Sequence, residues 1–504
     1  MRKTVLVGFM GAGKTTAARS LAQDAVDVDA ALETELGRPI AEVFATDGEA
    51  AFRAAEERLT LELLAGEGPR VLALGGGALT SPAIRQALDD GAHEVVWIDA
   101  DPDTAWQRAA GFGRPLARDP DAFRRLYAER EPLYAEVAGV IVPAERARQL
   151  SLILAAVADR PAGSTVLWAT SASGEYPVVI ASGLLTEDSY WPGAVPGRRF
   201  LVTDGHAGRL YGERLEPLSA RTAIMPGEQS KTIAHAEIVW TELVRAGMTR
   251  QDVLVALGGG VVGDLAGFCA ATYQRGVRFV QVPTTVVAQV DSAYGGKTGV
   301  DLPEAKNYVG AYHQPSAVLV DPLSLQTLPA AELAAGYAEV IKTALIAGGA
   351  LWARVRAGAG AESPDVIAGC ALTKLRIVAR DERDGGLRQV LNLGHTVGHA
   401  IETVTGYARF RHGEAVALGL LAALRLSGRD DLRAEVAELM VARGLADTMS
   451  DVDADAVVMA TQRDKKRLGE GMVPFVLLDA PGRARPGCEV SHRELIAAVR
   501  ELSA

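Results

Sequence analysis

A glycine-rich segment near the start of the chain constrains the fold most strongly. Residues 8–15, Gly-Phe-Met-Gly-Ala-Gly-Lys-Thr, fit the pattern G-x-x-x-x-G-K-[ST], follow the apolar run 4–7 and precede a helix-like run. Such a loop binds phosphate through its backbone N–H groups and the N-terminus of the following helix, so it requires a strand before it and a helix after it. The alternative is a turn that only joins a strand to a helix. The candidate ATP-binding residues are Gly8, Gly11, Ala12, Gly13, Lys14, Thr15 and Thr16.

Apolar runs alternate with helical patterns along much of the chain, which indicates parallel α/β sheets. The runs begin near residues 4, 70, 94, 198, 252, 278 and 317, and after Asp321 the pattern becomes mostly helical, with one β-like run near 472–479. A Pro/Gly/Ser-containing stretch at 158–164 interrupts the alternation and is expected to be a linker. We therefore predict a P-loop α/β domain at 1–158, a linker at 159–164, a nucleotide-binding α/β domain at 165–327 and a mainly helical domain at 328–504.

Composition narrows the function classes. The 504 residues include only three cysteines and carry a formal net charge of −11, which favours a reducing compartment and argues against non-specific nucleic-acid binding. We expect no signal peptide, no membrane span and a cytoplasmic location. Arginine provides most of the basic charge, so the few lysines mark positions where a compact ammonium group is wanted. Those that fall in motifs are Lys14, Lys231, Lys297, Lys306, Lys342, Lys374, Lys465 and Lys466.

The rest of the first domain carries residues suited to a phosphate acceptor. In Asp27-Val-Asp29, a strand end would place two carboxylates on one face, where one supports Mg²⁺ and the other orients a hydroxyl group; a solvated acidic turn is the alternative. Phe52-Arg53, the glycines 75–77, the segment 113–116 with Arg114, and Arg130 complete the set. Taken singly, the arginines are equally consistent with ordinary surface residues.

This set, in this order, resembles shikimate kinase over residues 1–158. The resemblance implies that Asp27 assists Mg²⁺ together with Thr15, that Asp29 is the base at the acceptor hydroxyl, and that Lys14 and Arg114 act on the transferred phosphate. Residues 108–119 would form the mobile lid. The segment between Lys14 and Asp27 is about one helical turn shorter than is usual in the family. The implied shikimate-binding residues are Asp29, Arg53, Gly75, Gly76, Gly77 and Arg130.

A second glycine-rich loop, Gly258-Gly-Gly-Val-Val-Gly263-Asp264, follows the apolar run 253–257 and precedes an apolar helical pattern. It fits G-x-G-x-x-G, but the acidic residue expected at the end of the next strand is missing, because that run ends in Thr284-Thr285. The loop is therefore equally consistent with a dinucleotide site and with a tight turn.

Three histidines lie close together in the last third of the chain. His395 and His399 stand four residues apart and so share one helix face, and His412 opens the next segment. Neutral imidazoles in this arrangement suit Zn²⁺, and Glu339, three residues before Lys342 on a predicted helix, is a candidate carboxylate ligand. Satisfied or surface histidines are the alternative.

Together these features resemble 3-dehydroquinate synthase from about 178 to 475. The resemblance implies NAD⁺, one divalent metal ion (Zn²⁺ or Co²⁺) on Glu339, His395 and His412, and a homodimer. In the family, hydride moves to NAD⁺ and back while phosphate is eliminated and a ring closes. The implied NAD contacts are Asp204, Glu228, Lys231, Gly260, Val261, Val262, Gly263, Asp264, Thr284, Thr285, Lys297, Lys306 and Thr327.

The resemblance also implies a substrate shell for a heptulosonate phosphate. His399 would contact substrate and transfer protons and would not bind the metal ion. Arg275 would reach the substrate phosphate from the neighbouring subunit. Asp384 stands where the family more often has glutamate. The other implied residues are Asp291, Lys297, Asn307, Lys342, Lys374, Arg388, Asn392, Lys465 and Lys466.

The sequence thus predicts a fusion of two enzymes of the shikimate pathway that act on small molecules with ATP, Mg²⁺, NAD⁺ and a divalent metal. Three alternatives remain open. The second part could be a metal-dependent polyol dehydrogenase or a different sugar-phosphate cyclase, and the first part could be a nucleotide sensor without kinase activity.

Overall fold

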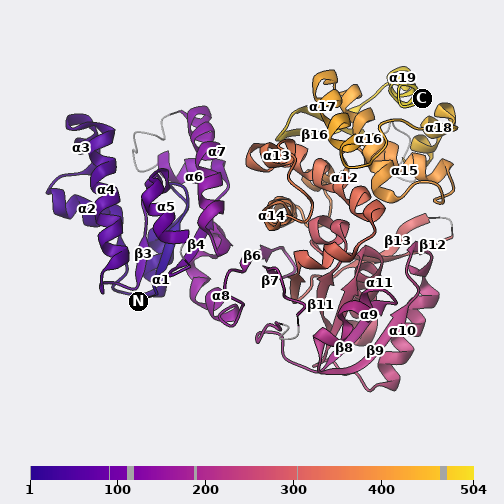
Figure 1. Ribbon diagram of the computed structural model, residues 1–504, viewed down its shortest axis with the longest axis horizontal. Helices are drawn as coiled ribbons and strands as arrows, with labels where there is room; N and C mark the ends of the chain where they lie inside the picture. Colours follow the sequence, from indigo (N-terminus) through magenta and orange to yellow (C-terminus); the bar gives the residue numbers. More distant parts are fainter. Residues whose placement is uncertain are drawn as a thin grey trace. The chain divides into compact units, whose positions relative to one another are not determined.

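The chain folds into two units of different architecture (Figure 1). The computed structural model describes residues 2–89, 91–110, 119–186, 190–303, 305–465 and 474–503, with the side chains of 462–465 left aside. The first unit contains Met1–Ala169 with two short later pieces, Pro177–Val179 and Pro192–Ala194, and the second unit contains the rest of the chain. Strand β7 (Glu175–Ile180) is divided between them.

Parallel strands form the sheet of the first unit, in the order β2-β3-β1-β4-β5-β6. The strands are nearly continuous apolar runs because helices cover both faces of the sheet (Figure 1). The strands are β1 (Thr4–Val7), β2 (Val26–Asp27), β3 (Val71–Ala73), β4 (Glu94–Asp99), β5 (Val140–Pro143) and β6 (Thr165–Thr170). The helices are α1 (Lys14–Leu21), α2 (Val28–Leu36), α3 (Ile40–Thr46), α4 (Gly48–Ala65), α5 (Pro82–Asp89), α6 (Pro102–Ala110), α7 (Pro120–Val137) and α8 (Leu150–Ala156), with 3₁₀ turns η1 (Ala78–Thr80) and η3 (Ala144–Gln149).

The second unit begins with an α/β part whose parallel strands pair in the order β14-β11-β10-β8-β9. Its core joins the apolar faces of α10 and α11 to β8, β10 and β11. The strands are β8 (Arg199–Asp204), β9 (Leu218–Ile224), β10 (Val253–Gly258), β11 (Arg278–Pro283) and β14 (Ala317–Val320); the helices are α9 (Ala207–Tyr211), α10 (Ile233–Arg245) and α11 (Gly260–Thr272). A separate antiparallel hairpin consists of β12 (Lys297–Leu302) and β13 (Ala305–Tyr312).

Short helical turns connect these elements. They are η4 (Gly212–Leu215), η5 (Glu228–Ser230), η6 (Tyr273–Arg275), a π-helical turn η7 (Ala288–Ser292) and η8 (Pro322–Thr327).

Helices dominate the rest of the second unit, as predicted. They are α12 (Ala330–Ala347), α13 (Gly349–Arg356), α14 (Pro364–Arg380), η9 (Leu387–Asn392), α15 (His395–Val404), α16 (His412–Leu426), α17 (Asp430–Val441), α18 (Ala454–Lys465) and α19 (His492–Arg500). The predicted late strand is β15 (Pro474–Ala480), which pairs with β16 (Arg483–Glu489). The predicted fold class is therefore confirmed: a P-loop α/β domain, a second α/β domain and a helical C-terminal part.

One local prediction was wrong. Asp27 ends β2, but the chain then turns directly into α2, so Asp29 lies in the first turn of a helix and not on a strand. The Asp27 side chain accepts a hydrogen bond from the Ala30 N–H at 3.3 Å and so caps this helix, which explains why the strand stops there. Among the described residues, no helix is both long enough and apolar enough to cross a membrane.

Candidate active sites

The phosphate loop of the first unit has the predicted strand–loop–helix setting between β1 and α1. Gly8, Gly11 and Gly13 have φ values of 138°, 80° and 95°, a region that favours glycine. The Lys14 ammonium donates hydrogen bonds to the carbonyl oxygens of Gly8 at 2.8 Å and Phe9 at 3.1 Å. The loop therefore curls around the position that Lys14 occupies, with the N-terminus of α1 facing the same space. This arrangement fits nucleotide phosphates.

Both predicted carboxylates of the first unit lie beside functional partners. Thr15 donates its hydroxyl hydrogen to Asp27 at 2.5 Å, which brings the two candidate Mg²⁺ ligands together. A Cβ atom on Gly75 would lie 2.6 Å from the Asp29 carboxylate, so Asp29 faces the glycines that follow β3 even though it is helical. The segment between Lys14 and Asp27 is shorter than is usual in the family. Even so, the eight-residue helix α1 is long enough for Thr15 and Asp27 to be in contact.

The two arginines predicted to bind shikimate, Arg53 and Arg130, also meet at the glycines 75–77. Arg130 is buried and donates to the Gly76 carbonyl oxygen at 3.2 Å, and a Cβ atom on Gly77 would lie 2.5 Å from the Arg53 guanidinium. Sequence reasoning missed Glu56, which is buried and pairs with Arg53 at 2.6 Å. Arg114 and most of the predicted lid lie outside the described residues.

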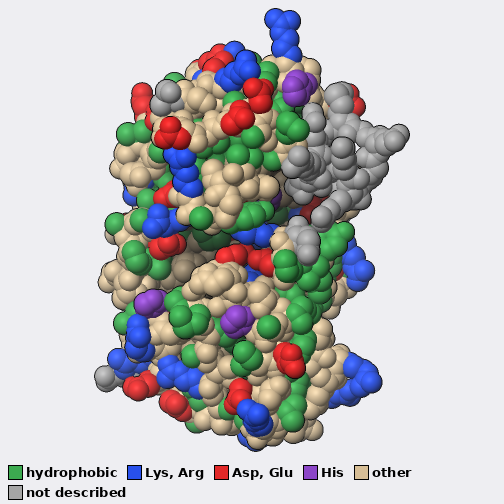
Figure 2. Space-filling model, turned by 90° about the vertical axis from the view of Figure 1, so that its right-hand side faces the viewer, with side chains coloured by type: hydrophobic (Ala, Val, Ile, Leu, Met, Phe, Trp, Pro, Cys, Tyr) green, Lys and Arg blue, Asp and Glu red, His purple; other side chains and the backbone are tan. Residues whose placement is uncertain are grey.

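A large cleft of about 1570 Å³ opens in the second unit between the α/β part and the helical part. Figure 2 shows a hollow across this face, with acidic and basic side chains gathered in it. Most of the predicted nucleotide contacts line the cleft, whereas Gly263 and Lys297 do not. The lining contacts are Asp204, Glu228, Lys231, Gly260, Val261, Val262, Asp264, Thr284, Thr285, Lys306 and Thr327.

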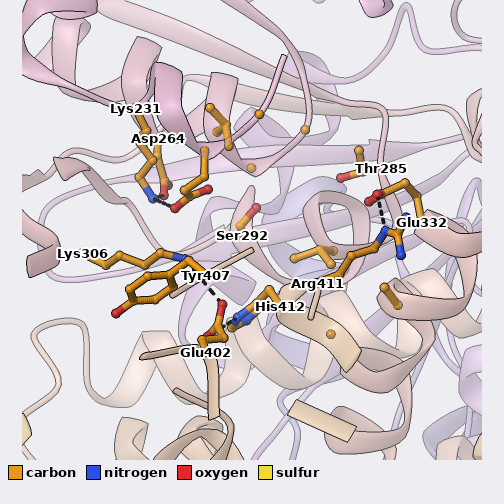
Figure 3. Close-up of a pocket in the computed structure, with 18 of the residues that line it drawn as sticks. Lys231, Asp264, Thr285, Ser292, Lys306, Glu332, Glu402, Tyr407, Arg411 and His412 are labelled. Atoms are coloured by element: carbon orange, nitrogen blue, oxygen red, sulfur yellow. Dashed lines mark hydrogen bonds and ion pairs between the residues drawn. The ribbon is translucent and has the colours of Figure 1, made fainter. Parts of the chain in front are cut away.

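The second glycine loop lines the cleft and packs closely against the residues that follow β11. It joins β10 to α11, and a Cβ atom on Gly259 would lie 2.9 Å from the Thr285 side chain. Buried Lys231 pairs with Asp264 at 2.7 Å, as Figure 3 shows. Although desolvation opposes charge on the ammonium, Asp264 and Glu228 raise the pKa of Lys231. The helix N-terminus, the glycines and this lysine fit the phosphates of a dinucleotide.

Three histidines and one glutamate converge at the cleft: Glu339, His399 and His412 line it, and His395 lies beside them. Oε1 of Glu339 on α12 lies 3.4 Å from Nε2 of both His395 and His412, and the Glu339 side chain is only 1% exposed. Ligand atoms of His395, His399 and His412 lie within 4.8 Å of one another. As predicted, His395 and His399 share one face of α15, with ring centroids 5.3 Å apart. Two imidazole nitrogens and a carboxylate oxygen directed at one point fit Zn²⁺ or Co²⁺.

Asp291 lies between two buried lysines beside this group. It pairs with Lys374 and lies 3.1 Å from Lys342, which in turn lies 2.5 Å from Glu339. Although burial disfavours a charged carboxylate, the two ammonium groups hold the pKa of Asp291 well below its ordinary value. This network is a chain of alternating charges that ends at the candidate metal ligands.

Another group of predicted substrate residues lies at the segment 381–388. The Arg388 guanidinium is 2% exposed and donates to the carbonyl oxygens of Glu382 and Gly295. Lys297 pairs with Asp384 at 2.5 Å. Arg388, Lys297, Lys342, Lys374 and Asn392 are not part of the cleft lining, although Asp291, Asn307 and His399 are.

Another predicted substrate residue, Arg275, also lies outside the cleft lining. Arg275 is exposed, has a φ of 68° and does not line the cleft of its own chain. The Lys465 side chain and the whole of Lys466 lie outside the described residues. Sequence reasoning also missed Glu402, a buried carboxylate between His412 and Lys306 (Figure 3). Glu402 stands one helical turn after His399, but this spacing alone does not show that it is buried beside His412.

Three stretches of the chain match family models. Residues 10–159 match shikimate kinase, residues 221–335 match 3-dehydroquinate synthase N-terminal, and residues 336–467 match 3-dehydroquinate synthase C-terminal. The 3-dehydroquinate synthase of Caulobacter vibrioides (strain NA1000 / CB15N) is 43% identical over 350 residues, which cover 64% of this chain and 94% of that protein.

Solved structures of two synthases resemble about two thirds of this chain. That of 2-deoxy-scyllo-inosose synthase, complexed with carbaglucose-6-phosphate, NAD⁺ and Co²⁺, has a TM-score of 0.60 and 25% identity, and covers 67% of this chain and 100% of that chain. That of 2-epi-5-epi-valiolone synthase from Streptomyces hygroscopicus subsp. jinggangensis 5008, with NAD⁺ and Zn²⁺ bound, has a TM-score of 0.59 and 28% identity, and covers 66% of this chain and 99% of that chain.

Proposed function

Since the chain belongs to the 3-dehydroquinate synthase family and carries a shikimate kinase domain before it, we propose that it is a bifunctional enzyme of the shikimate pathway. The first unit phosphorylates shikimate with ATP and Mg²⁺. The second converts 3-deoxy-D-arabino-heptulosonate 7-phosphate to 3-dehydroquinate and phosphate, with NAD⁺ and a divalent metal ion. The convergence of Glu339, His395 and His412 beside the Asp291 lysine pair carries the second assignment.

In the kinase, the work of the protein is to position two substrates and stabilise charge. The loop N–H groups and Lys14 hold the outer phosphates, and Thr15 and Asp27 would hold Mg²⁺ when it is bound. Arg53 and Arg130 bind the shikimate carboxylate, which directs the ring toward the glycines 75–77. Asp29, beside Gly75, accepts the proton of the attacking hydroxyl.

In the cyclase, Glu339, His395 and His412 would hold the metal ion, and the loop at Gly258–Gly260 with Lys231 would hold NAD⁺. When bound, NAD⁺ accepts and returns hydride and the metal ion polarises a hydroxyl group. Lys342, Lys374 and Arg388 supply positive charge for the substrate phosphate and carboxylate. His399, which does not pair with Glu339, is the residue we assign to proton transfer; desolvation and its two histidine neighbours lower its pKa to about 3.

The proposed homodimer rests on Arg275. This exposed residue does not line its own cleft, which supports the assignment that it reaches the site of a second subunit. Mixing the inactive variants Arg275→Ala and His395→Ala should restore cyclase activity, because hybrid dimers would contain one site with both residues intact. Mixtures that stay inactive would contradict a shared site.

The test of the cyclase is product identification with metal-loaded protein and catalytic NAD⁺. We expect stoichiometric phosphate and 3-dehydroquinate without net NADH. Accumulating NADH would indicate a polyol dehydrogenase, and phosphate with another ring product would indicate a different cyclase. For the kinase, we expect ADP release that depends on shikimate, whereas ATP binding without it would indicate a nucleotide sensor.

A further inference from the structure

Glu402 contacts one residue from each of the two ligand sites proposed for the cleft. Its side chain is 4% exposed and projects from α15. One carboxylate oxygen, Oε2, lies 3.3 Å from Nδ1 of His412, and the other, Oε1, lies 3.4 Å from Nζ of Lys306. Figure 3 shows the carboxylate between the two partners. The proposed mechanism gives Glu402 no part in either site.

We propose that Glu402 is a positioning residue that couples metal binding to NAD⁺ binding in the cyclase. The inference rests on the proposed function, which assigns His412 to the metal ion and Lys306 to NAD⁺.

The contact with His412 fixes which ring nitrogen faces the metal site. Nδ1 points to Glu402, while Nε2 points to Oε1 of Glu339 at 3.4 Å. A hydrogen donated from Nδ1 to the carboxylate leaves the Nε2 lone pair free and directed at the point that Glu339 and His395 share. A carboxylate partner of this kind orients a histidine ligand and increases its basicity.

The contact with Lys306 places an ammonium group from the α/β part against the helical part. Lys306 lies on β13, and its ammonium lies 4.2 Å from the centre of the Tyr407 ring. Tyr407 has a φ of 58°, and its backbone N–H donates to the Glu402 carbonyl oxygen at 2.8 Å. The Glu402 carboxylate and the Tyr407 ring, both near the C-terminal end of α15, therefore fix the position of the Lys306 ammonium group.

One buried carboxylate shared by two sites produces coupling in both directions. Metal binding orders His412 and hence Glu402, which favours the Lys306 position needed by NAD⁺. Thermodynamic linkage then requires NAD⁺ to increase metal affinity by the same factor. Typical coupling energies correspond to about 5- to 150-fold.

The experiment compares the metal-free, full-length protein with Glu402→Gln. Co²⁺ affinity is measured by competition with a chromophoric chelator, with and without saturating NAD⁺, and NAD⁺ affinity is measured by calorimetry, with and without Co²⁺. We expect each ligand to tighten the other at least about fivefold in the unchanged protein. In Glu402→Gln, we expect Co²⁺ affinity to fall about 10- to 100-fold and the coupling to fall below about twofold.

Two further variants separate coupling from damage to the fold. Lys306→Met should lose the coupling but keep its Co²⁺ affinity without NAD⁺, because the contact of Glu402 with His412 remains. Glu501→Gln removes a carboxylate that pairs with Arg425 and Arg433 outside the cleft, and should leave both affinities and the coupling unchanged.

Affinities that are independent of each other in the unchanged protein would overturn the inference, as would full coupling in Lys306→Met. If Glu402→Gln fails to fold, the coupling between Co²⁺ and NAD⁺ binding measured in Lys306→Met tests the inference by itself. A different ring product with intact coupling would contradict the proposed substrate but not this inference, whereas a protein that binds neither Co²⁺ nor NAD⁺ would overturn both.

Discussion

At the scale of single residues, the phosphate loop depends on backbone space that only glycine leaves free. Gly11 has a φ of 80°, and a Cβ atom there would lie 2.3 Å from the Ala105 carbonyl oxygen. A side chain would meet both an unfavourable dihedral region, which costs about 1–2 kcal/mol, and a backbone clash that the sheet and α6 cannot easily relieve.

We therefore expect Gly11→Ala to reduce shikimate phosphorylation by about 100-fold or more, because the loop N–H groups lose their alignment with phosphate. Coupled ADP release in the presence of shikimate measures this. Gly68→Ala is the control, since no atom lies within 4 Å of a Cβ atom placed there. Near-normal activity of Gly11→Ala would show that the loop tolerates displacement.

Asp252 gives a pH-dependent prediction away from both sites. It accepts hydrogen bonds from Arg198 and from the Thr249 N–H, which lower its pKa to about 2 although burial opposes ionisation. Because the folded pKa lies below the unfolded value, this stabilisation is present above about pH 4 and disappears as the pH falls through about 2.

We expect Asp252→Asn to lower the free energy of unfolding of the second unit by about 1–2 kcal/mol at pH 7, and this difference to shrink as the pH falls below about 4. Urea unfolding followed at several pH values measures it. Asp479→Asn, which removes an exposed pair with Arg485, should change stability by less than about 0.5 kcal/mol. A loss that does not vary with pH would assign the effect to packing.

Motif spacing and family resemblance identified the residues that we propose to contact substrates, but not the acids that pair with those residues. Lys14, Asp29 and Arg53 stand at motif positions, so sequence identified them. Glu56 and Glu402 are acids within the helices α4 and α15, and acids on helices mostly face solvent. Only the tertiary packing that buries them beside Arg53 and His412 shows their importance.

At the scale of elements, buried parallel strands could be predicted because they are nearly continuous apolar runs. The β12–β13 hairpin was not predicted, because β13 is half exposed, carries polar residues and shows no apolar alternation. The turn into α2 was also mispredicted, since an Asp that caps a helix looks the same in sequence as one that ends a strand.

The Asp381 side chain stabilises the fold of the segment 381–388 through hydrogen bonds to its backbone. Asp381 accepts hydrogen bonds from the backbone N–H groups of Gly385 and Gly386, both at 2.8 Å, and of Arg388 at 2.9 Å. These bonds fold the segment that carries Arg388 and Asp384, the partner of Lys297. Since the Asp381 side chain contacts Arg388 at its backbone N–H, we expect its effect on catalysis to act through this folding.

We expect Asp381→Ala to lower cyclase kcat/KM about 10- to 100-fold, mainly through KM for the heptulosonate phosphate, and to leave the kinase unchanged. Asp381→Asn should recover part of the loss, because the amide oxygen still accepts. Steady-state kinetics of both reactions measure this, with Asp365→Ala, which breaks an exposed pair with Arg354, as the control. An unchanged KM in Asp381→Ala would mean that the segment folds without this side chain.

At the scale of the whole molecule, each proposed reaction draws its described residues from one unit. Lys14, Asp29, Arg53 and Arg130 all belong to the first unit, and the metal-binding and nucleotide-binding residues all belong to the second. Each unit has its own sheet strands and its own buried core. The proposed reactions are not consecutive in their pathway, so nothing in this chemistry requires one site to pass its product to the other.

Independent sites predict opposite effects for two single changes. Lys14→Ala should abolish shikimate phosphorylation, because no other described residue of the loop offers an ammonium group to the outer phosphates, and should leave 3-dehydroquinate formation within about twofold. His395→Ala should do the reverse, since it removes one of the three groups that converge on the metal position. Both reactions are assayed on the same preparations, with circular dichroism to verify folding. If either change silenced both reactions in a folded protein, the two units would be energetically coupled, and catalysis in one would require the intact site of the other.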